Sequence, residues 1–208
     1  MARKTKEDKE KTHRALLGAA AELFTTVGVE ACTLNAIAEK AGVTRGAFYW
    51  HFKNKEDILK ALWVAYTKPA LEAYQANILA SPPEMKLQEL RQSLCNIFSR
   101  IENETELGQV FCIILGNSEL AIRNPKVKDF FNAERRTFFE TIEHVFQEQK
   151  RLGHLPKEIN THVTATGLVC LVSGIISEYF TGFEEIKLSD HGAVFLDTYF
   201  RGMGHKNR

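Results

Sequence analysis

TLNAIAEKAGVTRGAFYWHFK, residues 33–53, has the spacing of two short helices joined by a tight turn. Two such helices cross closely only where a small residue separates them, and Ala38 supplies it. Gly42, four positions later, tolerates the positive φ that the turn needs. Val43 and Phe48 supply apolar contacts that hold the second helix on the first. The stretch therefore predicts a helix-turn-helix motif, which presents its second helix to the major groove of DNA.

The residues of the predicted second helix suit contact with DNA. Arg45 is long enough to reach guanine edges or phosphates, and Tyr49 can touch a thymine methyl group or hydrogen-bond a phosphate. Gly46 and Ala47 are small enough for close approach to the duplex. The aromatic pair also has a plainer interpretation, because Tyr49 and Trp50 suit an ordinary core. The basic residues that follow suit either DNA-backbone contacts or a solvated face: His51, Lys53 and Lys55.

Outward from this motif, the whole chain is predicted to be all-α, with about nine helices. It has five prolines and long apolar series of period near 3.6. A first helix is expected to end at Gly28, and a fourth to begin after Asn54 and to kink or break at Pro69. The first three helices form a small helix-turn-helix head. The expected helices of the remaining body are 85–101, 125–153, 161–181 and 189–202.

Charge and composition agree with a two-part organisation. The 208 residues carry a formal net charge of +1, which excludes a polycation that coats nucleic acid along its whole length. Residues 1–60 hold 11 Lys and Arg against 8 Asp and Glu, so a modestly basic head precedes a modestly acidic body. We expect a DNA-binding domain over residues 1–66, with its motif at about 33–52. A second domain for ligand binding and dimerisation is expected over residues 67–208.

Several function classes find no support in the sequence. The four cysteines are scattered without a C-x-x-C pair, so we expect no metal, no cofactor and no disulfide framework. Nucleotide-binding, nucleophile-elbow and zinc-protease motifs are missing from the sequence, so an enzyme is not expected. The N-terminus is charged, and the apolar stretch 163–180 is interrupted by polar residues. We therefore expect a cytoplasmic protein that has no membrane partner.

The stretch from Arg14 to Trp63 closely resembles the TetR family of transcriptional regulators. Residues 15–59, ALLGAAAELFTTVGVEACTLNAIAEKAGVTRGAFYWHFKNKEDIL, match the family pattern almost position by position. Residues 42–59 look especially like the AcrR-type branch, which represses multidrug efflux pumps. The resemblance implies that a basic arm at Arg3, Lys4 and Lys6 adds phosphate or minor-groove contacts. Carried onto this chain, the family's DNA-contact positions are Thr33, Thr44, Arg45, Gly46, Ala47, Tyr49, Trp50, His51, Lys53 and Lys55.

The function that this resemblance implies is a ligand-responsive repressor. It would bind a pseudo-palindromic double-stranded operator as a homodimer, control a multidrug efflux operon, and leave DNA when a small apolar or cationic inducer binds. An alternative of the same fold is a repressor of a metabolic operon that senses an acyl or other metabolite. A protein-interaction adaptor, and a redox sensor acting through Cys112 or Cys170, are further alternatives.

The family's dimers are held by the last two helices, and the residues here agree with that arrangement. Gly167 and Gly174 are seven positions apart, so they lie on nearly the same helical face, where a partner helix can approach. The alternative is a helix that is buried inside one subunit. The residues assigned to the dimer interface are Gly167, Leu168, Leu171, Gly174 and Ile175.

Aromatic residues of the body suit a ligand cavity. Eleven of the fourteen phenylalanines follow residue 67, although most of them are expected to be core. The candidate residues lie on the helices that, by the family resemblance, surround the usual ligand cavity. The apolar candidates are Trp63, Tyr66, Phe98, Phe111, Leu115, Phe138 and Ile142, with Asn117 and Glu119 as polar anchors.

Overall fold

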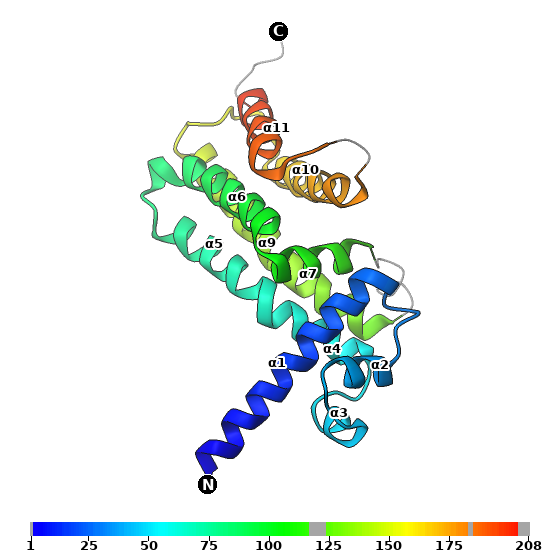
Figure 1. Cartoon of the computed structure of the whole chain (residues 1–208). Helices are drawn as coiled ribbons and strands as arrows, with labels where there is room; N and C mark the ends of the chain where they lie inside the picture. Colours follow the sequence, from blue (N-terminus) through cyan, green and yellow to red (C-terminus); the bar gives the residue numbers. More distant parts are fainter. Residues whose placement is uncertain (1, 117–123, 183–184, 204–208) are drawn as a thin grey trace. The chain divides into compact units, whose positions relative to one another are not determined.

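A computed structural model describes residues 2–116, 124–182 and 185–203 of the chain (Figure 1). Every regular element in these ranges is helical, which confirms the predicted all-α class. The first elements are α1 (Ala2–Val27), α2 (Leu34–Lys40), α3 (Arg45–His51), α4 (Lys55–Leu62), the π-helical turn η1 (Trp63–Thr67), α5 (Lys68–Ala80) and the 3₁₀ turn η2 (Pro83–Met85). The others are α6 (Lys86–Asn103), α7 (Thr105–Gly116), α9 (Pro125–Arg151), α10 (Thr161–Thr181) and α11 (Leu188–Gly202).

The helices group into two compact units. The first unit consists of residues 1–68 and 106–128, and the second of residues 69–105 and 129–208. The core of the first unit joins α1 to the helix-turn-helix through fully buried side chains such as Leu16, Ile37 and Phe48. Val110 and Ile113 of α7 belong to the same core. The sequence analysis missed α7, which adds a helix from later in the chain to the core of the first unit.

The ends of the short helices follow from local chemistry. Thr33, Thr44 and Asn54 each accept a hydrogen bond from a backbone N–H three residues later, as N-cap side chains do. Gly28 and Gly42 adopt φ values of +82° and +68°, which favour glycine, and each follows a helix as predicted. The predicted end of the first helix at Gly28 is therefore confirmed, because α1 ends at Val27, and α4 begins directly after Asn54 as predicted.

Pro69 lies in a chain segment that stays helical. The prediction was a kink or a break, whereas α4, η1 and α5 follow one another without an intervening loop. In η1 the turn is wider, and the N–H of Lys68 donates to the carbonyl of Trp63, five residues earlier. A proline in a regular α-helix clashes with the carbonyl four residues before it. The π-helical turn alters the backbone at that point, so the helix tolerates Pro69.

The second unit is built on α6, α9, α10 and α11 together with α5. Gly192 of α11 packs so closely on Phe98 of α6 that a Cβ atom there would lie 2.4 Å from the Phe98 ring. The same two helices are joined by an ion pair between Arg91 and Asp197. Tyr199 of α11 donates its hydroxyl to the backbone carbonyl of Thr164 in α10. These contacts fix α11 against both of its neighbours, α6 and α10, as Figure 1 shows for their ribbons.

One described helix, α10, is long and apolar enough to cross a membrane by length and composition alone. A third of its most apolar stretch is buried in the protomer. Buried helices of soluble proteins pass the same test, so a single such helix is weak support for a membrane span. The exposed remainder of α10 includes Val163, and Val194 and Phe195 are exposed on α11. Both helices therefore keep apolar surface that the protomer does not cover.

Candidate nucleic-acid interface

Helix α3 divides cleanly into a buried face and an exposed face. Phe48 is fully buried, and Phe52, directly after the helix, is nearly so, which fixes α3 on the core of the first unit. Tyr49 and Trp50 are exposed, and Trp50 exposes 64% of its surface. Large aromatic side chains that are exposed to water are unfavourable in free energy unless a partner covers them, so this face is suited to binding. The interpretation of Tyr49 and Trp50 as core aromatics is wrong.

The exposed face begins at the N-terminus of α3. Thr44 and Arg45 are exposed there, and the Arg45 guanidinium lies 5.4 Å from the centre of the Tyr49 ring. Gly46 is exposed, and the nearest atom to a Cβ built on it is 3.9 Å away, so its backbone is open to close approach. Ala47 is half-buried. An arginine, a tyrosine and an open glycine thus lie together on one helix end, as base-reading surfaces require.

Helix α1 contributes two residues to this face that the sequence analysis missed. The Lys9 ammonium lies 4.1 Å from the centre of the Trp50 ring, in a cation–π contact. The His13 ring stacks on Phe52 at 5.0 Å and lies 5.5 Å from the ring of His51. Lys9 and His13 are one helical turn apart on α1. This four-residue spacing is all that the sequence offers to indicate that the two side chains share a face. The predicted arm residue Lys6 is exposed on the same helix.

His51 is half-buried where α3 meets α1. Burial lowers the pKa of His51 below its ordinary value, and the nearby charges of His13 and Lys9 lower this pKa further, against an opposite effect of Glu10. The imidazole of His51 therefore favours its neutral form at neutral pH. In that form it offers a phosphate one N–H donor without a full positive charge.

We expect acid to destabilise the protein partly through His51. Because the folded state holds the pKa of His51 below 6.5, the unfolded chain takes up this proton first as pH falls. The contribution of His51 to the free energy of unfolding is thus present above pH 6.5 and is lost below it. Urea unfolding at pH 7.5 and 5.5 should show a smaller loss in His51→Gln than in the unmodified protein. Equal losses in both would contradict this assignment.

The two lysines after α3 differ in what their ammonium groups do. Lys55 donates from Nζ to the backbone carbonyls of Val29 and Glu30, each at 2.7 Å, and so ties the turn after α1 to the start of α4. Lys53 is exposed, and its backbone N–H donates to the carboxylate of Asp57 at 3.2 Å. Lys53 is therefore the better placed of the two to meet a phosphate.

Thr33 and Thr44 are both exposed, and both use their hydroxyl oxygens as caps. Thr33 accepts from the N–H of Ala36 at 3.1 Å, and Thr44 from that of Ala47 at 3.2 Å. Each hydroxyl hydrogen remains available to a DNA phosphate, because a hydroxyl that accepts one bond still donates another. The DNA-contact role of these two residues, like that of the other eight, stays a prediction.

The residues predicted to bind ligand are divided between the two units. In the first unit, Trp63 and Phe111 have ring centres 6.3 Å apart, and Tyr66 packs on the core. Burial raises the pKa of Tyr66. Leu115 is half-buried in α7. In the second unit Phe98 and Ile142 are fully buried, and Phe138 lies 5.1 Å from the ring of Tyr74. Asn117 and Glu119 lie outside the described residues.

The five residues predicted for the dimer interface also differ in their surroundings. Leu168 and Ile175 are buried within the protomer, and Leu171 is half-buried. Gly167 faces Tyr199, whose hydroxyl is 2.9 Å from where a Cβ would lie. Gly174 is exposed, with no atom within 4 Å of that position. Of the five, Gly174 offers the most open surface to a second chain, and the interface stays a prediction.

Metal-binding chemistry finds no scaffold in the described ranges. No group of three or more His, Cys, Asp or Glu side chains within residues 2–116, 124–182 and 185–203 is placed to hold a metal ion. Cys32 is buried, whereas Cys170 is exposed. Burial raises the thiol pKa of Cys32, Cys95 and Cys112, which lowers their reactivity as thiolates.

Comparison with known proteins identifies similar regulators. A family model described as bacterial regulatory proteins, tetR family, matches residues 16–62. The probable acrEF/envCD operon repressor of Escherichia coli K12 is 40% identical over 207 residues, which covers 97% of this chain and 90% of that protein. The HTH-type transcriptional regulator AcrR of Shigella flexneri is 29% identical, with 96% and 94% covered.

A solved structure agrees with the fold of the whole chain. It is that of NalD, the secondary repressor of the MexAB-OprM multidrug efflux pump in Pseudomonas aeruginosa. The TM-score is 0.81 at 26% identity, and the match covers 96% of this chain and 99% of NalD. The similarity therefore extends through both units and is not limited to the helix-turn-helix.

Proposed function

Because this chain belongs to the TetR family of bacterial regulatory proteins, we propose that it represses transcription as a homodimer bound to a pseudo-palindromic operator. The observation that carries the proposal is the exposed face of α3. Arg45, Gly46 and Tyr49 lie at its N-terminal end, and Trp50 is held by Lys9 of α1. In helix-turn-helix proteins the N-terminal residues of this helix contact base edges.

Dimerisation supplies the second head that a two-fold operator requires. The two DNA-binding domains of a dimer bind half-sites about 34–36 Å apart, or at multiples of that distance. The exposed apolar residues Val163 on α10, and Val194 and Phe195 on α11, support a partner surface formed by these two helices. Burial of such side chains against a second copy is favourable, at roughly 25 cal/mol per Å².

We propose a multidrug efflux operon as the target, and a small apolar or cationic molecule as the inducer. The support is the similarity to NalD, which is described as the secondary repressor of a multidrug efflux pump, and to the probable acrEF/envCD operon repressor of Escherichia coli. The ligand must bind better to a conformation whose heads are wrongly spaced than to the operator-bound conformation. Operator DNA then weakens ligand binding by the same factor.

The proposed role is not enzymatic, and the proposed site of action is the cytoplasm. The relatives above are named as transcriptional regulators and repressors. A bacterial operator lies on DNA in the cytoplasm, where the exposed thiol of Cys170 also stays reduced. The residue boundary between the DNA-binding part and the ligand-binding part is proposed at 66/67.

Arg45→Ala is expected to weaken operator binding by about 5- to 150-fold and to relax base preference at one position of each half-site. The variant should fold normally, because Arg45 is exposed and its guanidinium lies over the exposed Tyr49 ring, away from the core. The measurement is fluorescence anisotropy with DNA from upstream of the gene and from upstream of its divergent neighbour. A scrambled duplex of equal length serves as the reference.

Two matched variants separate base reading from charge. Lys53→Ala should weaken binding to operator and to scrambled DNA by a similar factor, as loss of a phosphate contact does. Lys126→Ala removes the same charge from an exposed position at the start of α9 and should change neither. Operator binding no tighter than scrambled-DNA binding in the unmodified protein would overturn the proposed function.

A further inference from the structure

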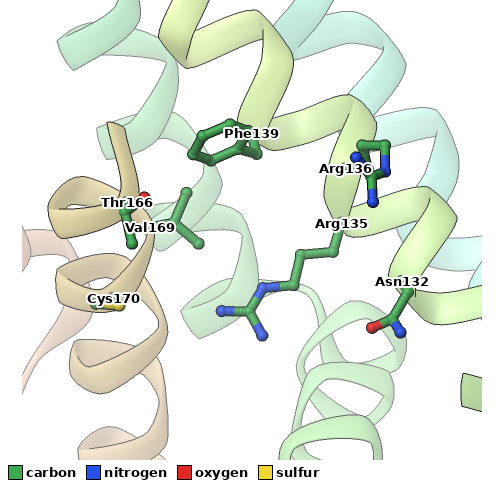
Figure 2. A pocket seen from close by; sticks show the side chains of 7 residues that line it. All are labelled: Asn132, Arg135, Arg136, Phe139, Thr166, Val169 and Cys170. Atoms are coloured by element: carbon green, nitrogen blue, oxygen red, sulfur yellow. The ribbon is translucent and has the colours of Figure 1, made fainter. Parts of the chain in front are cut away.

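A cavity of about 290 Å³ lies between α9 and α10 in the second unit (Figure 2). It is lined by two kinds of side chain that differ in polarity. Asn132, Arg135 and Arg136 of α9 form a cationic part. The apolar part comes from both helices: Phe139, Val169 and Cys170. None of the residues predicted to bind ligand lines this cavity.

The Arg135 guanidinium is the charged group nearest the middle of the cavity. Figure 2 shows its side chain extended from α9 toward α10, whereas Arg136 projects from a different side of α9. Both arginines are exposed, and neither has an ion-pair partner in the part of the chain that the structure describes. The described lining residues include no acidic side chain. The cavity therefore carries uncompensated positive charge.

An acidic residue beyond the apolar end of the cavity, on the same helix, is engaged with α10. Glu143, one turn beyond Phe139, contacts Nδ1 of His162 at 3.3 Å. The His162 ring in turn lies edge-on to Phe139, with ring centres 5.0 Å apart. These contacts hold Phe139 as the apolar end wall and leave Glu143 paired with a residue of α10. They do not supply a counter-charge to Arg135.

The hydrogen-bond donors of the cavity are also limited to one end. The Thr166 hydroxyl donates to the carbonyl of His162 at 2.8 Å, so it offers a ligand its methyl group and no donor. The guanidinium groups of Arg135 and Arg136 and the side-chain amide of Asn132 supply the donors, and all three residues belong to α9. A planar guanidinium binds a carboxylate through two parallel hydrogen bonds.

We propose that this cavity binds an amphiphilic anion, with its carboxylate on Arg135 and a short apolar chain along Phe139 and Val169. The volume is at the small end of ligand cavities, which span about 300–1,000 Å³. A short chain therefore fits better than a long one. The negative charge of this ligand is opposite to that of the cationic drugs considered above as inducers. That such an anion acts as an inducer rests on the proposed function, whereas the binding of the anion to the cavity does not.

Three probes with the same eight-carbon chain test the charge preference: octanoate, octanol and octyltrimethylammonium. Isothermal titration of the purified full chain without DNA should show octanoate binding tightest. Arg135→Gln should weaken octanoate binding by about 10-fold or more, as loss of a charge-assisted pair does. Arg135→Glu should reverse the order, so that octyltrimethylammonium binds tighter than octanoate.

Arg151→Gln is the matched control, because Arg151 is an exposed arginine at the C-terminal end of the same helix and outside the cavity. It should bind octanoate within twofold of the unmodified protein. Equal binding of octanoate and octanol, or an unchanged affinity in Arg135→Gln, would overturn the proposal. Octanoate binding by a monomeric variant, together with no binding by the dimer, would also overturn the proposal. That result would show that the partner copy fills the cavity.

Addition of octanoate to the operator complex separates this inference from the proposed function. Operator binding together with no octanoate binding at millimolar concentration would overturn the cavity proposal and leave the repressor function intact. Octanoate binding that depends on Arg135, together with no preference for operator over scrambled DNA, would support the cavity proposal and overturn the repressor function. Release of operator by octanoate in the unmodified protein but not in Arg135→Gln would support both.

Discussion

Gly192→Ala is expected to lower the free energy of unfolding by about 1–3 kcal/mol, the usual cost of overpacking a core. A Cβ at position 192 would lie 2.4 Å from Cδ2 and 2.8 Å from Cε2 of Phe98. Phe98 is fully buried, so its ring has no free space into which it can withdraw. Either α6 and α11 separate, or the ring leaves its preferred rotamer, and both cost energy.

The matched control is the same substitution at Gly18. That residue lies inside α1, is exposed, and has no atom within 4 Å of the Cβ position. Gly18→Ala should raise the free energy of unfolding by about 0.5–1 kcal/mol, because alanine restricts the unfolded chain and suits a helix. Urea unfolding followed by circular dichroism, at one protein concentration, measures both. A Gly192→Ala variant as stable as the parent would show that the helices adjust without cost.

Gly174→Arg is expected to convert the dimer into a monomer and to weaken operator binding by ~10²-fold or more, since two linked heads bind far more tightly than one. Gly174 is exposed within a protomer and has open space around it, so the protomer accepts a long side chain. An interface of closely packed helices does not, because an arginine there separates α10 from its partner and buries an unpaired charge.

Light scattering coupled to size-exclusion chromatography gives the oligomeric state, and anisotropy gives the operator affinity. Leu79→Arg is the control: it also places an arginine on an exposed position of the second unit, on α5. It should remain dimeric and bind operator as the parent does. A Gly174→Arg protein that is still a dimer would exclude this face of α10 from the interface.

The features that were predicted correctly depend on neighbours within a few residues. The Asn54 side chain bonds to the backbone N–H three positions later, and Gly28 and Gly42 need only their own positive φ. Helix α7 was missed because its segment, TELGQVFCIILG, has few polar residues to mark one exposed face.

The features that were missed depend on contacts between distant residues. No local pattern relates Lys9 to Trp50, or Gly192 to Phe98, because each pair meets only after separate helices have packed. The role of Lys55 differs from the predicted DNA contact for the same reason. Its basic side chain suits DNA when only the sequence is known. In the fold, its ammonium meets two backbone carbonyls that are 25 and 26 residues away in the chain. Arg135 faces α10 across a similar separation.

The chain contains two tryptophans, and their surroundings make them separate optical reporters. Trp50 is 64% exposed beside the Lys9 ammonium, whereas Trp63 is 8% exposed and lies near the Phe111 ring in the first unit. An indole in water emits at longer wavelength than one in an apolar environment. Emission collected on the long-wavelength side of the band therefore comes mainly from Trp50, and a blue shift of this emission would follow operator binding in real time without a label. Trp63 would stay silent in that experiment and would respond to events inside the first unit.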